Sequence, residues 1–306
     1  MKQTTLRKSV CCSGIGLHSG QKIELTLRPA DSDTGILFVQ VDGPERQHLS
    51  LGPERVVSTG LATSIGNGNA KISTVEHLLG AVQGMGIDNL VVEVCGPEIP
   101  ILDGSAAPFV FLFHQAGLRT QNVGKKVFAL KKTIRYEQGG KWIKGRPYDG
   151  LKVRYTIDFG HPRVGRQVKT LVLDPDVFVQ EISRARTFGF LRDVEALQRS
   201  GLARGGSLEN ALVLDEYDVV NPEGMRFDDE PVRHKILDFL GDMFMLGRPI
   251  RGDFLIHCSG HALNNDFCRF LFQNRDDYLS LIDLGTSSGQ WSEVTAPHPG
   301  TEPAWV

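Results

Sequence analysis

A helical pattern begins with Val232-Arg233-His234-Lys235-Ile236-Leu237-Asp238 and continues to Gly247, and the rest of the chain is organised around it. Residues four apart share one face of a helix, so His234 and Asp238 project side by side. An imidazole and a carboxylate in this relation are a suitable pair of zinc ligands. The pattern is short, however, and a half-exposed helix with a polar edge is the simpler explanation. A catalytic metal would also need a third ligand from elsewhere in the chain.

The composition is that of an ordinary globular protein, with 41% hydrophobic and 23% charged residues among 306. This length suggests two domains of roughly 150 residues each. A formal net charge of −2 gives no field that would steer the chain to nucleic acid or to an acidic membrane surface. The five cysteines are scattered and form no Cys-x-x-Cys pair. This argues against a disulfide framework or a cysteine zinc site and fits a reducing compartment.

The two ends of the chain differ in character. The N-terminal residues, from Met1 to Lys8, lack the apolar core of a signal peptide, and no stretch of the chain is long enough to span a bilayer. We therefore expect a cytoplasmic protein without stable membrane insertion. Residues 285–306 are rich in Gly, Ser, Thr and Pro, a composition that predicts a disordered tail.

The first third of the chain is predicted to form strands. Residues 22–29 alternate apolar and polar side chains with period two, as a half-buried strand does, and residues 35–41 follow as a second strand. The three glycines of residues 14–20 could form a phosphate-binding loop, but no helix pattern follows them. A turn between two strands is the better interpretation.

A second helix is predicted after Ile72. Ser73 followed by Glu76 matches a capping box at a helix start, which would give Glu76 a purely structural role. His77 lies in the first turn of this helix. We expect the helix to end near residues 84–86, where two glycines occur, and a strand to follow at 88–94.

A polar segment at residues 120–126 separates two halves of the chain. We place the domain boundary there, with a first α+β domain of residues 1–125 and a second of 126–284. The second half is predicted to contain strands at 127–136, 151–159, 210–213 and 252–257, an amphipathic run at 193–198, a loop at 201–206, and a loop at 259–265 before a final helix with Phe267, Phe270, Leu271 and Leu279.

The two halves share a short sequence layout. Leu78-Leu79-Gly80, followed by Gly86 and a strand, corresponds to Phe239-Leu240-Gly241, followed by Gly247 and a strand. In this register His77 is equivalent to Asp238. A duplicated unit would bring the two helices together across an approximate two-fold axis, where polar residues at matching positions would meet. The repeat therefore suggests His77 as the third ligand.

Two histidines and one carboxylate leave a fourth zinc position open for water, as in a catalytic rather than a structural site. Zinc lowers the pKa of bound water to about 7 and polarises a carbonyl group. Glu76, beside a ligand, could take the proton of this water. His261, in the glycine-hinged loop, could stabilise an oxyanion or protonate a leaving amine. These residues predict a metal-dependent hydrolase of an amide or ester, with a non-catalytic sugar- or nucleotide-binding module as the alternative.

Several motifs, in the same order, resemble those of the zinc-dependent UDP-3-O-acyl-N-acetylglucosamine deacetylases. The matching segments are residues 14–20, Ile72-Ser73-Thr74-Val75-Glu76-His77-Leu78, residues 98–106, Ala185-Arg186-Thr187-Phe188-Gly189-Phe190, residues 233–238 and Gly260-His261-Ala262-Leu263-Asn264-Asn265. The resemblance covers the chain from about residue 3 to about residue 284. It implies removal of the N-acetyl group from UDP-3-O-(3-hydroxyacyl)-N-acetylglucosamine, the first committed step of lipid A biosynthesis in Gram-negative bacteria.

The resemblance also implies a fold and a set of roles. The fold would be α+β, with two similar domains, each a mainly antiparallel sheet plus two helices, and with the helices sandwiched between the two sheets. His77, His234 and Asp238 would bind Zn²⁺. The catalytic residues would be Glu76 as general base, His261 as general acid or oxyanion stabiliser, Asp242 as the residue that orients His261, and Thr187 as a donor to the oxyanion.

The resemblance implies substrate contacts mainly from the second domain. Lys235 and Phe188 would contact the sugar, and Lys141 and Phe159 would lie near the nucleotide. The segment from Phe188 to Val213 corresponds to an insert that forms an acyl passage, to which we assign Phe190, Val194, Gly206, Ser207 and Val213. Burial of the same apolar face in the core is the alternative. The expected partner is the UDP-linked acylated glucosamine, with no nucleic acid, and we expect a monomer.

Overall fold

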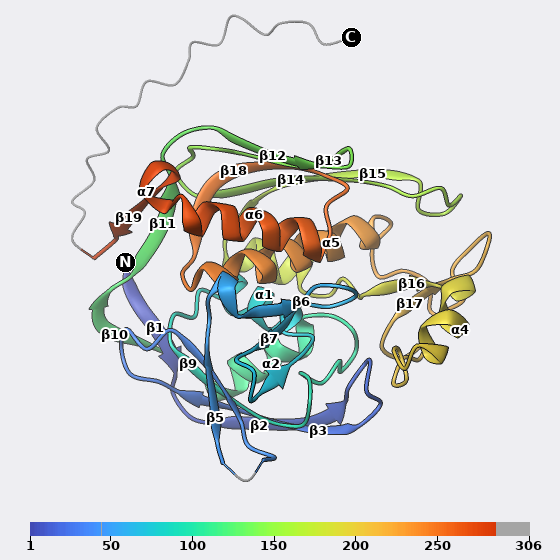
Figure 1. The fold of residues 1–306 in the computed structure, drawn as a ribbon, viewed down its shortest axis with the longest axis horizontal. Helices are drawn as coiled ribbons and strands as arrows, with labels where there is room; N and C mark the ends of the chain where they lie inside the picture. The colour runs from blue at the N-terminus through green and yellow to red at the C-terminus, as the bar shows by residue number, and fades with distance from the viewer. Residues whose placement is uncertain (44, 286–306) are drawn as a thin grey trace, which may run out of the picture.

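The computed structural model describes residues 1–43 and 45–285, and the predicted tail beyond 285 lies outside the described residues. Two sheets lie on opposite sides of a layer of helices (Figure 1). The predicted fold class, α+β with helices between two mainly antiparallel sheets, is confirmed. Among the helices in the described part of the chain, none is long and apolar enough to cross a membrane.

The first half builds a five-stranded sheet in the order β2-β3-β9-β4-β5. The predicted strand at residues 22–29 is β3, in which Ile23, Leu25 and Leu27 are buried and the alternate residues are more exposed. A separate strand pair and a small three-stranded sheet complete this half. The strands are β1 (Lys2–Leu6), β2 (Val10–Ile15), β3 (Lys22–Pro29), β4 (Ile36–Gln40), β5 (Gln47–Ser50), β6 (Val56–Ser58), β7 (Ser64–Gly66), β8 (Lys71–Ile72), β9 (Leu90–Cys95) and β10 (Leu118–Gly124).

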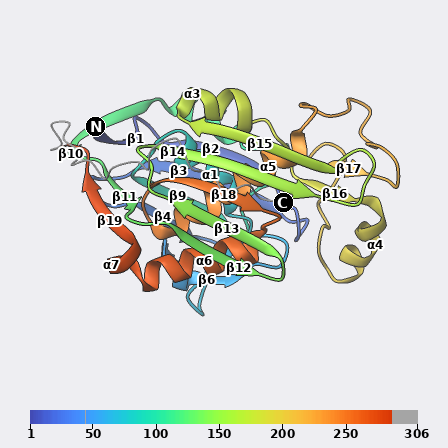
Figure 2. The same ribbon diagram turned by 90° about the horizontal axis from the view of Figure 1, so that it is seen from above.

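The second half repeats this design. Its strands β12, β13, β18, β14 and β15 lie in the same order and with the same relative directions as β2, β3, β9, β4 and β5, and the pair β11–β19 corresponds to β1–β10. The bounds are β11 (Lys126–Leu130), β12 (Ile134–Gln138), β13 (Lys141–Arg146), β14 (Leu151–Asp158), β15 (Arg166–Leu173), β18 (Ile250–His257) and β19 (Leu279–Asp283). Seen from above, this sheet covers the helices (Figure 2). The repeat inferred from a few residues therefore extends over both halves.

The helices α1 (Glu76–Gly84) and α5 (Glu230–Met243) cross closely in the middle layer. A side-chain carbon at Gly80 would lie 2.6 Å from Leu237, and one at Gly241 would lie 2.0 Å from the backbone oxygen of Glu76. Gly80 and Gly241 are equivalent positions of the repeat. Both glycines are needed because only a residue without a side chain lets the two backbones approach this closely.

Each half carries a second helix and an insertion. The second helices are α2 (Ala107–Ala116) and α6 (His261–Gln273), and η1 (Pro53–Arg55), η3 (Phe244–Leu246) and α7 (Arg275–Tyr278) are short turns. The insertion of the second half contains α3 (Pro175–Val177), the π-helical turn η2 (Phe178–Ile182), β16 (Phe188–Phe190), α4 (Leu191–Arg199) and β17 (Leu212–Leu214). The part with β16, α4 and β17 stands out from one side of the molecule in both ribbon views. We call it the lateral lobe.

Three local predictions are wrong. Ser73 does not cap α1, because its hydroxyl bonds that of Ser64 and the helix has no side-chain cap. His261 is the first residue of α6 rather than part of a loop, and Leu279 begins β19 rather than ending a helix. The domain boundary at residues 125/126 falls where β10 ends and β11 begins, and we propose it as the division between the halves.

Candidate metal centre and active site

Three candidate metal ligands converge where α1 crosses α5. His77 comes from the first turn of α1, and His234 and Asp238 come from successive turns of α5. One ligand atom from each side chain lies within 4.8 Å of the other two, and all three residues are buried. The two imidazole rings meet edge to face with centroids 4.8 Å apart. The structure thus brings together the three residues that the sequence grouped by the helical spacing and the repeat.

The protonation pattern of these side chains fits a cation between them. Nδ1 of His234 lies 3.1 Å from the carbonyl oxygen of Ala185, which can only accept, so this nitrogen carries the proton. In the neutral ring Nε2 then presents a lone pair to Oδ1 of Asp238, 3.2 Å away. Among the described residues no donor is paired with this buried Oδ1. Two acceptors facing each other in a buried site are repulsive unless a cation lies between them.

Lys235 forms an ion pair with Oδ2, the second carboxylate oxygen of Asp238. Its ammonium nitrogen lies 2.7 Å from Oδ2, and Oδ1 is the oxygen that faces His77 and His234. Burial by itself would raise the pKa of Asp238, but His234 and Lys235 hold that pKa well below its usual range. The carboxylate is therefore ionised at neutral pH, as a metal ligand must be.

Glu76 is buried beside the three ligands. Its Oε2 accepts a 3.0 Å hydrogen bond from the backbone N–H of Thr63, and its Oε1 lies 3.8 Å from Nε2 of His261. Burial raises the pKa of Glu76 to about 8, although the charge of His261 opposes this. A carboxyl group whose pKa lies near neutrality is suited to take up and release a proton.

His261 is held by a buried carboxylate. Its Nδ1 lies 2.9 Å from Oδ2 of Asp242, which also accepts from the side chain of Asn264, and Oδ1 of Asp242 accepts from the hydroxyl of Thr63. Burial alone would lower the pKa of His261, but Asp242, Asp238 and Glu76 raise it to about 10. The ring is therefore protonated at neutral pH, and its Nε2 is directed toward Glu76 and Asp238.

An aromatic group adjoins the ligands on the lobe side. Phe188 lies edge to face with His234 and with Phe159, and Phe190 contacts both of these phenylalanines. The ammonium of Lys235 lies 5.5 Å from the centre of the Phe188 ring. Of the residues assigned to the substrate, Lys235, Phe188, Phe159 and Phe190 thus form one group next to the candidate metal ligands.

The remaining substrate residues lie farther out. Val194 on α4 and Val213 on β17 are half-buried, and Gly206 and Ser207 are exposed in the loop between these elements. Lys141 is exposed at the start of β13. The next residue, Trp142, stacks its ring on His257. Thr187 is fixed by its backbone, because its N–H donates to Gly104 and its carbonyl accepts from Leu212.

Several residues that build this site carried no recognisable signal in the sequence. Thr63 donates its backbone N–H to Glu76 and its hydroxyl to Asp242, but it lies in a segment rich in Gly and Ser. A contact made by a backbone N–H leaves no signal in the residue type. Ala185 contributes only its carbonyl oxygen. Asn264 lies in a segment that was recognised as a motif, but its contact with Asp242 depends on the start of α6 and could not be read from spacing.

Comparison with known proteins identifies the family. A family model described as UDP-3-O-acyl N-acetylglycosamine deacetylase (LpxC) matches residues 3–273. The chain belongs to this family. A curated UDP-3-O-acyl-N-acetylglucosamine deacetylase of Oleidesulfovibrio alaskensis is 53% identical over 98% of this chain and 99% of its own length. Deacetylases of the same name from Nitratidesulfovibrio vulgaris and Histophilus somni are 51% and 50% identical, over 93% and 92% of this chain and 92% and 94% of theirs.

The LpxC family match extends over both halves, so it includes all the elements that carry the candidate site. Glu76 and His77 come from the first half, and His234, Asp238, Asp242 and His261 come from the second. Membership of this family was inferred from the motifs alone and is confirmed.

Proposed function

We propose that the chain is a zinc-dependent UDP-3-O-acyl-N-acetylglucosamine deacetylase in which His77, His234 and Asp238 bind the metal. The observation that carries this assignment is the convergence of three buried ligand atoms within 4.8 Å, one of them a carboxylate oxygen that has no donor among the described residues. The name borne by relatives about half identical over nearly the whole chain supports the substrate class. The reaction is hydrolysis of the N-acetyl group to acetate and the free amine.

Glu76 is proposed to act as the general base. Zinc, when bound, lowers the pKa of a water molecule and polarises the acetyl carbonyl group. Glu76 accepts the proton of the attacking water as the new C–O bond forms at the acetyl carbon. The hydrogen bond from Thr63 to Oε2 keeps Oε1 directed into the site. Charge on a bound cation would favour the ionised form of this carboxyl group.

His261 is proposed to act as the general acid. Its Nε2, 3.8 Å from Glu76 and 3.9 Å from Asp238, gives its proton to the amine nitrogen as the C–N bond breaks. Asp242 orients the ring through Nδ1, so that the proton to be transferred is on the nitrogen that faces the substrate. The hydroxyl of Thr187 donates a hydrogen bond to the oxyanion that develops on the acetyl group. This hydrogen bond strengthens as the negative charge forms.

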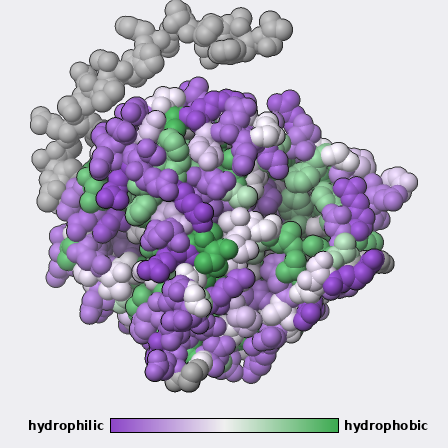
Figure 3. Space-filling model, viewed as in Figure 1, coloured by the Kyte–Doolittle hydropathy of each residue, from purple (hydrophilic) through white to green (hydrophobic). Residues whose placement is uncertain are grey.

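The acyl chain is proposed to bind along the lateral lobe. None of the residues of α4 whose side chains are described is fully buried, and Leu191 is 49% exposed. Hydrophobic side chains also gather on the molecular surface beside this lobe (Figure 3). The apolar face of α4 is thus not used by the core, and it remains available for a substrate chain. Lys235 and the aromatic group contact the sugar, and Lys141 lies toward the nucleotide.

The proposal is tested by measuring metal content and activity on the UDP-linked acyl sugar in the same preparation. We expect one zinc per chain in the wild-type protein. His77→Ala, His234→Ala and Asp238→Ala should each lose both the metal and turnover, because two ligands rarely retain zinc. A His234→Ala protein that keeps one tightly bound zinc and normal turnover would refute the assignment. Binding of the substrate without hydrolysis by the zinc protein would favour a non-catalytic binding module.

Cellular location and assembly stay predictions. We propose that the enzyme acts in the cytoplasm as a monomer, with the UDP-linked acylated glucosamine as its partner. Sedimentation of the purified protein tests the assembly state.

A further inference from the structure

One peptide group, between Ala185 and Arg186, is held from both sides by helix α5. Its carbonyl oxygen accepts from Nδ1 of His234 at 3.1 Å, and its N–H donates to Oε1 of Glu230 at 2.9 Å. Glu230 and His234 are four residues apart, so they lie on the same face of α5. The C=O and N–H of a trans peptide point in opposite directions, and this peptide therefore bridges the two side chains.

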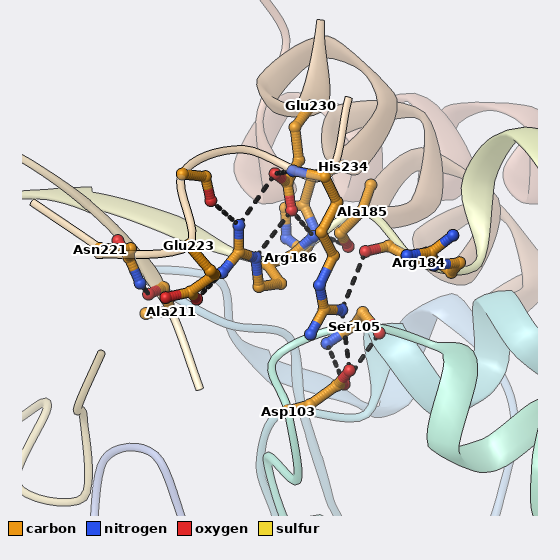
Figure 4. Close-up of polar contacts among 12 residues, drawn as sticks. Asp103, Ser105, Arg184, Ala185, Arg186, Ala211, Asn221, Glu223, Glu230 and His234 are labelled. Carbon is orange, nitrogen blue, oxygen red and sulfur yellow. Dashed lines mark hydrogen bonds and ion pairs between the residues drawn. The ribbon is translucent and has the colours of Figure 1, made fainter. Parts of the chain in front are cut away.

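Glu230 is the centre of a buried network (Figure 4). Its side chain is 0% exposed, and it pairs with the guanidinium of Arg186, which is 1% exposed. Oε2 of Glu230 also accepts from the backbone N–H of Arg226 at 2.6 Å. Arg226 in turn reaches the first half of the chain, where its guanidinium lies 2.8 Å from Asp103. The two backbone N–H groups that Glu230 accepts from belong to the segments that follow η2 and precede α5, so its carboxylate fixes both segments.

The arrangement polarises the ligand histidine. A carboxylate that accepts from the N–H of a peptide strengthens that peptide's carbonyl as an acceptor, because neighbouring hydrogen bonds polarise one another. The stronger acceptor holds the proton on Nδ1 of His234 and increases electron density on Nε2. Partners of this kind fix the tautomer and orientation of a metal-binding histidine and raise its affinity for the metal. Here the carboxylate acts through a peptide rather than directly.

We propose that Glu230 is a positioning residue for the metal centre, acting on His234 through the Ala185–Arg186 peptide. This inference rests on the proposed role of His234 as a ligand. The guanidinium of Arg186 pairs with the buried carboxylate of Glu230 and holds it in place, and the same peptide sets the start of the segment that carries Thr187 and Phe188. The network therefore couples the strength of one ligand to the position of the oxyanion donor.

The test compares metal affinity in matched variants of the full chain. Glu230→Gln removes the charge but can still accept the N–H, and we expect about tenfold weaker binding of zinc in competition with a chelator. Arg186→Met combined with Glu230→Leu replaces the pair by apolar groups of similar size, which a core commonly tolerates. With no acceptor left for the N–H, this double variant should bind zinc up to about a hundredfold more weakly.

The control is Glu223→Gln. Glu223 is 56% exposed and contacts the far end of the Arg186 guanidinium, so the two hydrogen bonds of the peptide remain. Its zinc affinity should stay within about twofold of wild type, because the Glu223 carboxylate of this ion pair is exposed to solvent and contributes little. The absorption spectrum of the cobalt-substituted proteins gives a second readout. It should change in the Glu230 variants and not in the control, since it reports the ligand field at the metal, to which His234 contributes.

The outcomes separate this inference from the function proposed above. A wild-type chain that binds no zinc would refute the metal site itself. In a second outcome, wild type binds zinc tightly while the folded double variant shows the same zinc affinity and the same cobalt spectrum. That result would refute only the role of Glu230. If Glu230→Gln fails to fold, the double variant decides the question alone, because it leaves no unpaired charge in the core.

Discussion

Glu76 illustrates how one residue can satisfy a structural and a catalytic interpretation of the sequence. The capping interpretation fails, because Ser73 bonds Ser64 and Glu76 bonds the N–H of Thr63. Glu76→Gln keeps an acceptor for this N–H but cannot take a proton. We expect turnover to fall roughly a hundredfold or more while zinc content is unchanged.

Ser73→Ala is the matched control for Glu76→Gln. It removes the hydroxyl on which the capping box depends, and turnover should stay near that of wild type. Steady-state kinetics and metal analysis of both folded variants provide the measurement. Normal turnover in Glu76→Gln would mean that Glu76 is not the base.

His261 should set the alkaline limb of the pH profile. Its pKa is raised to about 10 without a metal, chiefly by Asp242 against the effect of burial, so the proton is present at neutral pH and is lost as pH rises. A bound cation lowers that pKa, and the limb should therefore lie below pH 10 in the zinc protein. His261→Ala should lower kcat far more than it raises KM and should abolish the limb.

Asp242→Asn tests whether the carboxylate of Asp242 raises the pKa of His261. The substitution removes the carboxylate that raises the pKa of His261, so the alkaline limb of kcat/KM should move to lower pH. The profile of the zinc-loaded enzyme from about pH 6 to pH 10 is sufficient to detect it. A limb that stays in place or moves to higher pH would show that another group titrates there.

At the scale of elements, the crossing of α1 and α5 has no room for a side chain. A methyl group at Gly241 would lie 2.0 Å from the carbonyl oxygen of Glu76, and backbone cannot yield cheaply. Gly241→Ala should therefore cost about 1–3 kcal/mol or more in unfolding free energy and displace Glu76 and His77. Zinc affinity should fall with stability. Urea unfolding and chelator competition measure the two effects.

Gly60→Ala is the control for this substitution. A methyl group at Gly60 meets nothing within 4 Å, so stability and zinc affinity should be unchanged. If Gly241→Ala behaved like Gly60→Ala, the close crossing would not position the ligands.

The lateral lobe should determine the response to acyl length. Each buried methylene contributes up to about 0.8 kcal/mol, so removing four should lower kcat/KM by roughly two orders of magnitude. Gly206 is exposed, and an added carbon would lie 3.3 Å from the carbonyl oxygen of Ala203 and 3.6 Å from Leu17. Gly206→Phe narrows the loop beside α4 and should penalise long chains more than short ones.

The acyl-length series is measured on wild type, on Gly206→Phe and on Gly60→Phe, a position outside the lobe where an added carbon meets no atom within 4 Å. Only Gly206→Phe should change the dependence on chain length. A flat response in wild type would exclude a passage along the lobe and would leave the metal chemistry untouched.

The elements that the sequence predicted well are those whose pattern is local. The alternation in β3 and the apolar stripe of α5 follow directly from side-chain spacing. The start of α6 was missed because Asn264 and Asn265 favour turns by propensity. In the fold Asn264 is buried and bonds Asp242 and Ser259, and these tertiary contacts outweigh the local preference.

The same distinction holds for the site. Glu76, His77, His234, Asp238 and His261 could be grouped in advance because their chemistry lies in their side chains. Thr63, Ala185 and Glu230 could not, because their contributions involve backbone groups or pairs distant in sequence. The side chain of Thr63 reaches Asp242, 179 residues away, and no spacing rule predicts such a pair.

At the scale of the whole molecule, the metal should hold the two halves together. One ligand comes from α1 and two from α5, and one hydrophobic core includes residues of both halves. We expect a single calorimetric transition whose midpoint falls by several degrees when a chelator removes the zinc. A ligand at a thousand times its dissociation constant stabilises the folded state by about 4 kcal/mol.

His234→Ala provides the comparison for the calorimetry. Its transition should not respond to the chelator, because it has no metal to lose. Two separate transitions in the wild type, only one of them sensitive to the chelator, would show that the halves unfold independently.

The equivalence of the two halves has a consequence for how such a centre can originate. A symmetric pair of identical ancestral chains would place the same residue at the positions of His77 and Asp238, on either side of the axis, and would offer a metal two identical ligands. Fusion of two gene copies into one chain releases that constraint. One copy can then keep an imidazole where the other acquires a carboxylate. A single asymmetric centre, with different residues at equivalent positions of the two halves, becomes accessible once the copies diverge, and fusion keeps the two diverged copies together.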